Sequence, residues 1–296
     1  MARLPLPAPI YRVPNYLGRS DVEARLTEVE LDTTLEVFNL DSLPLEAKDL
    51  DRLADALELN ASVESFSARD CALSVTNLDQ LATVLEDSRS LTALDLSGNV
   101  LGGSGAASIA RALAKGQRSL KTLSLSESSL GLAGAQEIAK ALEAPSCRLQ
   151  ALDVSYSKLG EKGSARIAAM LRSNRTLETL NLAGNKAGDF VLDVLAGALA
   201  MNIKLKKLDL SENEISNLGA SYVGEMLANN KTLTDLILAW NNIKATGVDS
   251  INEGLAQNVA LLTLDLGGNP IGQAGIRALS EAQKCSTWRT IMWDEW

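Results

Sequence analysis

The segment Leu205–Asn213, Leu-Lys-Lys-Leu-Asp-Leu-Ser-Glu-Asn, recurs along the chain and decides its architecture. Four other copies also end in Asn, two end in Ser, and a diverged pair precedes them all. The further copies are Leu35–Leu43, Val63–Cys71, Leu91–Asn99, Leu120–Ser128, Leu149–Ser157, Leu177–Asn185, Leu233–Asn241 and Leu261–Asn269. Each copy begins 28 or 29 residues after the one before it. This fixed spacing predicts a solenoid, in which each unit stacks on its neighbour.

Each unit changes from the spacing of a strand to that of a helix. Apolar residues at positions 4 and 6 of the repeat, such as Leu208 and Leu210, predict a strand of about five residues with these side chains buried. Further on, apolar residues recur at i, i+3, i+4 and i+7, as in 106–113, and predict a helix of about 12 residues. Because helices are wider than strands, the stack must curve. We therefore predict a right-handed α/β horseshoe with parallel strands on the concave face and helices on the convex face.

Two positions of the repeat predict local backbone structure. We expect the Asn at position 9 to bond the backbone of neighbouring repeats and form a ladder, since buried backbone groups need partners. Cys71 stands at that position in the second repeat, where we expect a small buried thiol to take its place. Position 15 is commonly Gly, which permits a tight turn into the helix. Val191 replaces it in one repeat and predicts a locally different turn.

Composition excludes several classes of function. The chain has 296 residues, a net charge of −9 and no histidine. The absence of histidine excludes Ser-His-Asp and Cys-His catalysis and histidine-ligated zinc. The acidic balance argues against nucleic-acid binding, which depends on clustered Lys and Arg. An odd and sparse set of three cysteines favours a reduced, intracellular environment. The sequence has no apolar run long enough to span a membrane.

The repeat spacing divides the chain into four parts. Residues 1–19 are rich in proline and predict an extended arm, which is a second candidate contact. Residues 20–34 predict a capping helix of a partial repeat, beginning with a capping box from Ser20 to Glu23. Residues 35–287 hold nine repeats, and 288–296 predict a capping strand. We expect the tryptophans of that last segment to plug the end of the core, with a binding patch as the alternative.

The repeat also resembles a known class. The opening Leu-x-x-Leu-x-Leu-x-x-Asn-x-Leu-Gly, seen from Leu91 to Gly102, and the Gly-Ala start of the helices resemble leucine-rich repeats of the ribonuclease-inhibitor class. That class includes ribonuclease inhibitor, the sensor arms of NLR proteins and the Ran GTPase-activating proteins. The resemblance covers about residues 35–296. It implies a protein-binding solenoid, with a GTPase-activating regulator or a cytoskeletal or axonemal component as alternatives.

Position 5 of the repeat is expected to face the concave side, and four aspartates occupy it. Asp95, Asp153, Asp209 and Asp265 fall on alternate repeats, so neighbours in this series lie about 10 Å apart. That distance is too long for two carboxylates to share a proton or a metal ion, and we predict no catalytic, metal or cofactor site. One interpretation is an acidic track for a basic partner. The other is that solvated aspartates keep the open sheet soluble.

Position 8 lies at the rim of the concave face. Tyr156 and Trp240 occupy it in two repeats, and Glu127 and Glu212 occupy it in two others. Aromatic side chains are enriched among the anchor residues of protein interfaces. We therefore predict that these four residues contact a partner, with local packing against the following loop as the alternative for Trp240.

Together these observations predict a non-enzymatic, intracellular protein-protein interaction module, or a structural subunit of a larger assembly. We expect a protein partner with a basic or mixed surface, and neither nucleic acid nor membrane. The expected location is the cytoplasm, with association with the cytoskeleton as a further option. The expected binding surface is the acidic concave face and its rim.

Overall fold

The structure is a computed structural model that describes residues 18–115, 119–285 and 289–294. Helices and strands alternate throughout this part of the chain. The helices are α1 Arg19–Leu31, α2 Ala47–Leu59, α3 Val75–Asp87, α4 Gly102–Lys115, α5 Gly131–Glu143, α6 Gly160–Met170, α7 Gly188–Leu199, α8 Asn217–Asn229, α9 Ala245–Leu255 and α10 Gly272–Cys285. The strands are β1 Val37–Asn39, β2 Ser65–Ser67, β3 Ala93–Asp95, β4 Thr122–Ser124, β5 Ala151–Asp153, β6 Thr179–Asn181, β7 Lys207–Asp209, β8 Asp235–Ile237, β9 Thr263–Asp265 and β10 Thr290–Met292.

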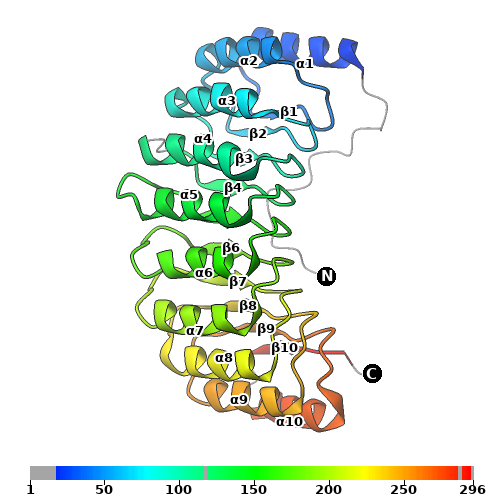
Figure 1. Ribbon diagram of the computed structural model, residues 1–296, viewed down its shortest axis with the longest axis vertical. Helices are drawn as coiled ribbons and strands as arrows, with labels where there is room; N and C mark the ends of the chain where they lie inside the picture. The colour runs from blue at the N-terminus through cyan, green and yellow to red at the C-terminus, as the bar shows by residue number, and fades with distance from the viewer. Residues whose placement is uncertain (1–17, 116–118, 286–288, 295–296) are drawn as a thin grey trace.

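The strands form one parallel sheet of 10 strands in sequence order, from β1 to β10. Its register pairs equal positions of successive repeats, as Leu94 with Leu123 and Leu123 with Leu152. Figure 1 shows the helices stacked along one side of the column, which bows so that both of its ends turn toward the strand side. The predicted α/β solenoid is confirmed. The strands have three residues rather than five, because the backbone turns directly after position 5.

One continuous core fills the space between the sheet and the helices. Leu94, Leu96, Leu208 and Leu210 are buried as predicted, and the core runs without a break from Val22 in α1 to Ile291 in β10. Burying one leucine side chain contributes about 2 kcal/mol, and each repeat gains most of this only when its neighbours are present.

The asparagine ladder at position 9 is confirmed. The Asn99 amide donates to the carbonyl oxygens of Ala68 and Leu96 at 2.8 Å, and its oxygen accepts the Cys71 N–H at 3.0 Å. Asn185, Asn213 and Asn241 join successive repeats in the same way. Cys71 acts as the predicted substitute, since its thiol lies 3.0 Å from the Leu40 carbonyl oxygen. Burial raises the pKa of this thiol to about 12, so it stays protonated.

A second asparagine ladder, not predicted from the sequence, runs along position 26, shortly before the strand of the next repeat begins. Its buried members are Asn60, Asn174, Asn202, Asn230 and Asn258. The Asn230 amide, for example, donates to the Leu199 carbonyl oxygen at 2.7 Å in the preceding repeat. Its oxygen accepts the N–H of Leu233, the first residue of the following repeat, at 2.7 Å. Each amide therefore ties the end of one helix to the start of the next strand.

Arg289 ends this second ladder. The sequence has Ser286 where another Asn would stand. The guanidinium of the buried Arg289 donates to the carbonyl oxygens of Asn258 at 2.7 Å, Leu261 at 2.9 Å and Leu255 at 3.3 Å. The Leu255 carbonyl corresponds to the Leu199 carbonyl two repeats earlier. One arginine thus supplies the donors that a further asparagine would provide.

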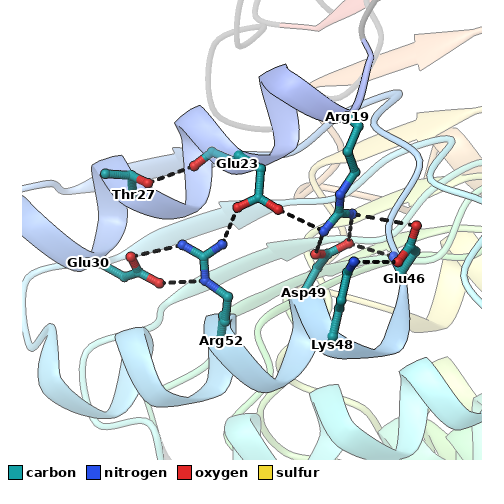
Figure 2. A network of polar contacts seen from close by, with 8 residues as sticks. All are labelled: Arg19, Glu23, Thr27, Glu30, Glu46, Lys48, Asp49 and Arg52. Carbon is teal, nitrogen blue, oxygen red and sulfur yellow. Dashed lines mark hydrogen bonds and ion pairs between the residues drawn. The ribbon is translucent and has the colours of Figure 1, made fainter.

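The first helix begins one residue earlier than predicted, and the capping box from Ser20 to Glu23 is wrong. Gly18 precedes the helix, and its N–H donates to the Asp21 carboxylate at 2.6 Å, so Ser20 lies inside α1. Glu23 pairs instead with Arg19 and Arg52. Figure 2 shows this ion network, in which these side chains, Glu30 and the fully buried Asp49 join α1 to α2.

The expectation of a different turn at Val191 is also wrong. The helix of that repeat starts at Gly188 with φ +65°, as its neighbour starts at Gly160 with φ +64°. The residue at position 12, not position 15, decides the turn. The repeats that have Ser216 or Lys244 there begin their helices from an extended residue instead.

Two expectations fall on the ends of the chain. The arm at 1–17, with Trp288 and Trp296, lies outside the described residues. Of the tryptophans expected to plug the core, Trp293 is partly buried against it, beside the buried Ile291.

Candidate partner-binding face

The four aspartates of position 5 lie on alternate strands of the sheet. The register places Asp95 opposite Ser124, and Ser124 opposite Asp153. Asp209 follows two strands later, and Asp265 two strands after that. Neighbouring carboxylates in this series are therefore separated by a whole strand, so the structure does not bring them together into one cluster.

Each of these aspartates also closes a turn at the end of its strand. Oδ1 accepts the N–H of the residue two positions on: Ser97 at 2.9 Å from Asp95, Ser155 at 2.8 Å from Asp153, Ser211 at 2.9 Å from Asp209 and Gly267 at 2.9 Å from Asp265. The three serines also donate their hydroxyls to the same oxygen. Asn39 and Asn181 do the same with an amide oxygen. The two interpretations of these aspartates from the sequence, an acidic track or a means of keeping the sheet soluble, did not include this structural role. The pattern Asp-x-Ser at positions 5 and 7 predicts it.

The environments of the carboxylates differ. The Asp95 side chain is 25 % exposed and lies 3.7 Å from the Arg69 guanidinium. Burial raises the pKa of Asp153 above its ordinary value, and hydrogen bonds from Ser155 and Asn181 offset this only in part. Burial also raises the pKa of Asp209, which is 8 % exposed. These two groups therefore lose their charge at a higher pH than an exposed aspartate, whose pKa is about 3.9.

Basic side chains interrupt the track. Arg69 approaches Asp95, and Lys207 stands two residues before Asp209, on the same face of β7. Asp235 lies opposite Lys207 on the next strand. The concave face therefore carries charges of both signs.

The rim residues share an unusual backbone conformation. Position 8 has a positive φ in every repeat from the first to the ninth: Ser42 (60°), Asp70 (52°), Gly98 (74°), Glu127 (58°), Tyr156 (53°), Gly184 (67°), Glu212 (55°), Trp240 (57°) and Gly268 (71°). Glycine adopts this region freely, whereas a bulky residue there is a genuine outlier that costs about 1 kcal/mol or more. Tyr156 and Trp240 are thus held in a conformation that their residue types disfavour.

Both aromatic rings lean over the glycine of the following repeat. A Cβ at Gly184 would lie 2.3 Å from the Tyr156 ring, and one at Gly268 would lie 2.5 Å from the Trp240 indole. The Tyr156 hydroxyl reaches beyond Gly184 and donates to the Glu212 carboxylate at 2.5 Å. Tyr156 is 42 % exposed and Trp240 is 56 % exposed. The rim therefore presents two rings supported from one side.

Of the predicted site residues, Glu212 and Trp240 share a depression in the surface, which Glu214 and Asn242 complete. Tyr156 joins this group through Glu212, whereas Glu127 occupies the same position on an earlier repeat and has no part in it. Within the described residues, no three Cys, Asp or Glu side chains gather in a way that could hold a metal ion. None of the described helices is long and apolar enough to cross a membrane.

Comparison with known proteins agrees with this geometry. A profile of the leucine rich repeat family matches residues 87–110, 173–189, 202–224, 229–251 and 257–280. A search of curated proteins by sequence finds no match. The chain is an α/β solenoid with one open face of its sheet. It is a leucine-rich repeat protein, as its sequence predicted.

Three solved structures illustrate the likeness. Actin-binding site 2 of leiomodin-1 is 23% identical, with 53% of this chain and 89% of that chain covered and a TM-score of 0.44. The C-terminal domain of Caenorhabditis elegans tropomodulin is 20% identical, with 52% and 93% covered and a TM-score of 0.42. TLR13 in its complex with ssRNA13 is 18% identical, with 85% and 35% covered and a TM-score of 0.53. Of these three, the TLR13 structure has a TM-score above 0.5, and at 18% identity it indicates a shared fold alone.

Proposed function

We propose that this chain is a non-enzymatic module, or a subunit of a larger assembly, that binds a protein partner through its concave face and rim. Leucine-rich repeats are protein-interaction modules, and the observation that supports this surface is the open face of the sheet. Helices pack on its other face, and the concave face carries Asp95, Asp153 and Asp265 beside the exposed rim aromatics. A rigid, preformed surface of this kind loses little entropy on binding.

The partner that fits has a basic or mixed surface. Carboxylates outnumber cations on the chain, 37 to 28, which favours encounter with positive charge. Arg69 and Lys207 on the same face offer pairing to a partner's acidic groups. We also propose an intracellular location, because the three cysteines of the described structure are free thiols and reducing compartments keep thiols in this form.

The test must separate binding from folding, because the aspartates close turns. Asp→Lys would remove an acceptor that the backbone uses. Asp→Asn keeps an oxygen for the turn, as Asn39 and Asn181 show, and removes the charge. At Asp153 it also removes the oxygen that accepts from the Asn181 amide at 3.1 Å. We therefore propose the triple variant D95N, D153N and D265N as bait in quantitative pull-downs at two salt concentrations.

The expected result is loss of specific partners that the wild-type chain retains at low salt. A matched control is the variant E143Q, on the helical side, where Glu143 pairs with Arg166. If the triple variant retains the same partners with the same salt dependence, the aspartates of the acidic track do not form the binding surface. Loss with E143Q alone would move the binding surface to the helices.

A further inference from the structure

The depression at the rim is a slot between two repeats. One face of the Trp240 indole rests on Gly268, which belongs to the following repeat. The Trp240 side chain is 56 % exposed, and Glu212 and Glu214 of the preceding repeat line the same depression. Trp240 and Glu212 occupy equal positions of adjacent repeats. The slot is thus lined by an exposed indole and two carboxylates.

A hydrogen bond from an earlier repeat holds the Glu212 carboxylate in place beside the slot. Its Oε1 accepts the Tyr156 hydroxyl at 2.5 Å, from the side away from Trp240. That bond draws the carboxylate toward the earlier repeats. Glu214 has one cation in reach, Lys186, at 4.0 Å, and both side chains are well exposed. An exposed pair at this distance contributes little, so an incoming cation can replace Lys186 without a large cost.

We infer that this slot binds the guanidinium of an arginine in an extended segment of the protein partner. A guanidinium is flat, stacks on an indole face and donates several hydrogen bonds in its own plane. The carboxylates of Glu212 and Glu214 are acceptors placed beside that face. Trp and Arg are the residue types most enriched at the centres of interfaces.

This inference rests on the proposed function, because it names the group that the partner inserts at the rim. It is tested with defined peptides so that the two can fail separately. The probe is a blocked peptide, Gly-Ser-Arg-Ser-Gly, and its control is the same peptide with citrulline, which has the same shape and no charge. Binding to the full chain and its variants is followed by NMR through the line widths of the peptide signals, and in the wild type also through the Trp240 indole N–H, assigned with W240F.

We expect the arginine peptide to bind with a millimolar Kd and to shift the Trp240 indole signal. The citrulline peptide should cause no such shift. W240A should weaken binding at least tenfold, and the double variant E212Q and E214Q at least fivefold, with a smaller salt dependence. E143Q is the control for general charge, because Glu143 lies on the helical side, where it pairs with Arg166. It should bind as the wild type does.

Equal binding of the arginine and citrulline peptides would overturn the inference. So would unchanged affinity in W240A, with circular dichroism showing that the variant is folded. A loss in E143Q as large as in the double variant would also overturn it, because the effect would then be one of general charge. Each of these results leaves the proposed partner-binding face standing, since that is tested by the aspartate variants.

Discussion

The hydroxyl of Tyr156 donates to the carboxylate of Glu212 across the repeat between them, with the ring lying over Gly184. Two side chains 56 residues apart in sequence thus meet on the rim. The contact is possible because the intervening repeat has no side chain at that position. Contacts on the rim therefore depend on the order of residue types at position 8 in successive repeats, and not only on each residue type by itself.

Replacing Gly184 by alanine tests this contact. At φ +67° any side chain is strained, and its Cβ would also meet the Tyr156 ring. Gly131, at φ +59°, has no atom within 4 Å of its Cβ position and is the matched control. We expect G131A to cost about 1 kcal/mol from backbone strain alone. G184A should cost about 0.5–1 kcal/mol more, the worth of one lost hydrogen bond.

The measurement is urea unfolding of both variants in the wild-type and Y156A backgrounds. The extra cost of G184A should vanish once Tyr156 is gone. A cost that persists in Y156A would show that the ring plays no part.

The position 9 ladder predicts a graded series at Asn185. Its amide donates to the carbonyl oxygens of Val154 and Leu182 at 2.9 Å, and its oxygen accepts the Ser157 N–H at 3.1 Å. We expect N185A to cost about 3 kcal/mol, because several buried backbone groups lose their partners. N185S should cost clearly less, since Ser157 fills the same position and donates to Leu125 at 2.8 Å. Urea midpoints of the two variants check this, and equal costs would contradict it.

Arg289 predicts a local effect at the end of the solenoid. R289A should leave carbonyl oxygens of Leu255, Asn258 and Leu261 without these donors. We expect hydrogen exchange to accelerate in α10 and β10 while β3 to β6 keep their protection, because repeats depend on their neighbours. R289M, which keeps the apolar stem, should behave similarly. Uniform loss of protection along the chain would refute a local role.

The buried carboxylates predict opposite dependences on pH. Burial raises the pKa of Asp209. The contribution of this side chain to the stability of the fold is therefore fully present below the ordinary pKa of an aspartate and is lost as pH rises through the raised pKa. D209N is neutral at every pH, so its stability relative to the wild type should increase between pH 3 and pH 7. Urea midpoints at both values measure this, and a constant difference would contradict it.

For Asp49 the sign is reversed. Burial alone raises its pKa, but hydrogen bonds from Arg19 and the Glu46 N–H outweigh burial and hold the pKa below the ordinary value. Its contribution is present above the ordinary pKa and is lost as pH falls through the lowered one. D49N should therefore expose α1 to faster hydrogen exchange at pH 6, and the difference from wild type should shrink in strong acid. A difference that grew in acid would show the opposite linkage.

The repeated pattern made the fold predictable. Leu94 and Leu96, like their counterparts in other repeats, alternate in a way that only a buried strand explains, and the Asn at position 9 recurs where strands end. The second ladder was open to the same reasoning, since Asn174, Asn202 and Asn230 also recur every 28 residues. It was missed because asparagine is common in loops and so seemed to need no special role.

The site was less predictable for a physical reason. Exposure and position on a strand follow from repeat position, so Trp240 and Asp95 were placed on the correct surfaces. The direction in which Trp240 leans depends on its positive φ and on a glycine one repeat later. The second acceptor role of Asp95 depends on Ser97. Such relationships join two positions of one repeat or positions of successive repeats, and a pattern of single positions does not contain them.

The two ladders also bear on how this array can change in length. Duplicating an interior repeat, such as the one that starts at Leu205, would place each new Asn213 and Asn230 against the same carbonyls as before. Duplicating the segment that contains Arg289 would instead set a large cation where a slim amide must fit between two neighbours. We therefore expect longer engineered versions of this array to tolerate added units before the segment that contains Arg289 better than a second copy of that segment.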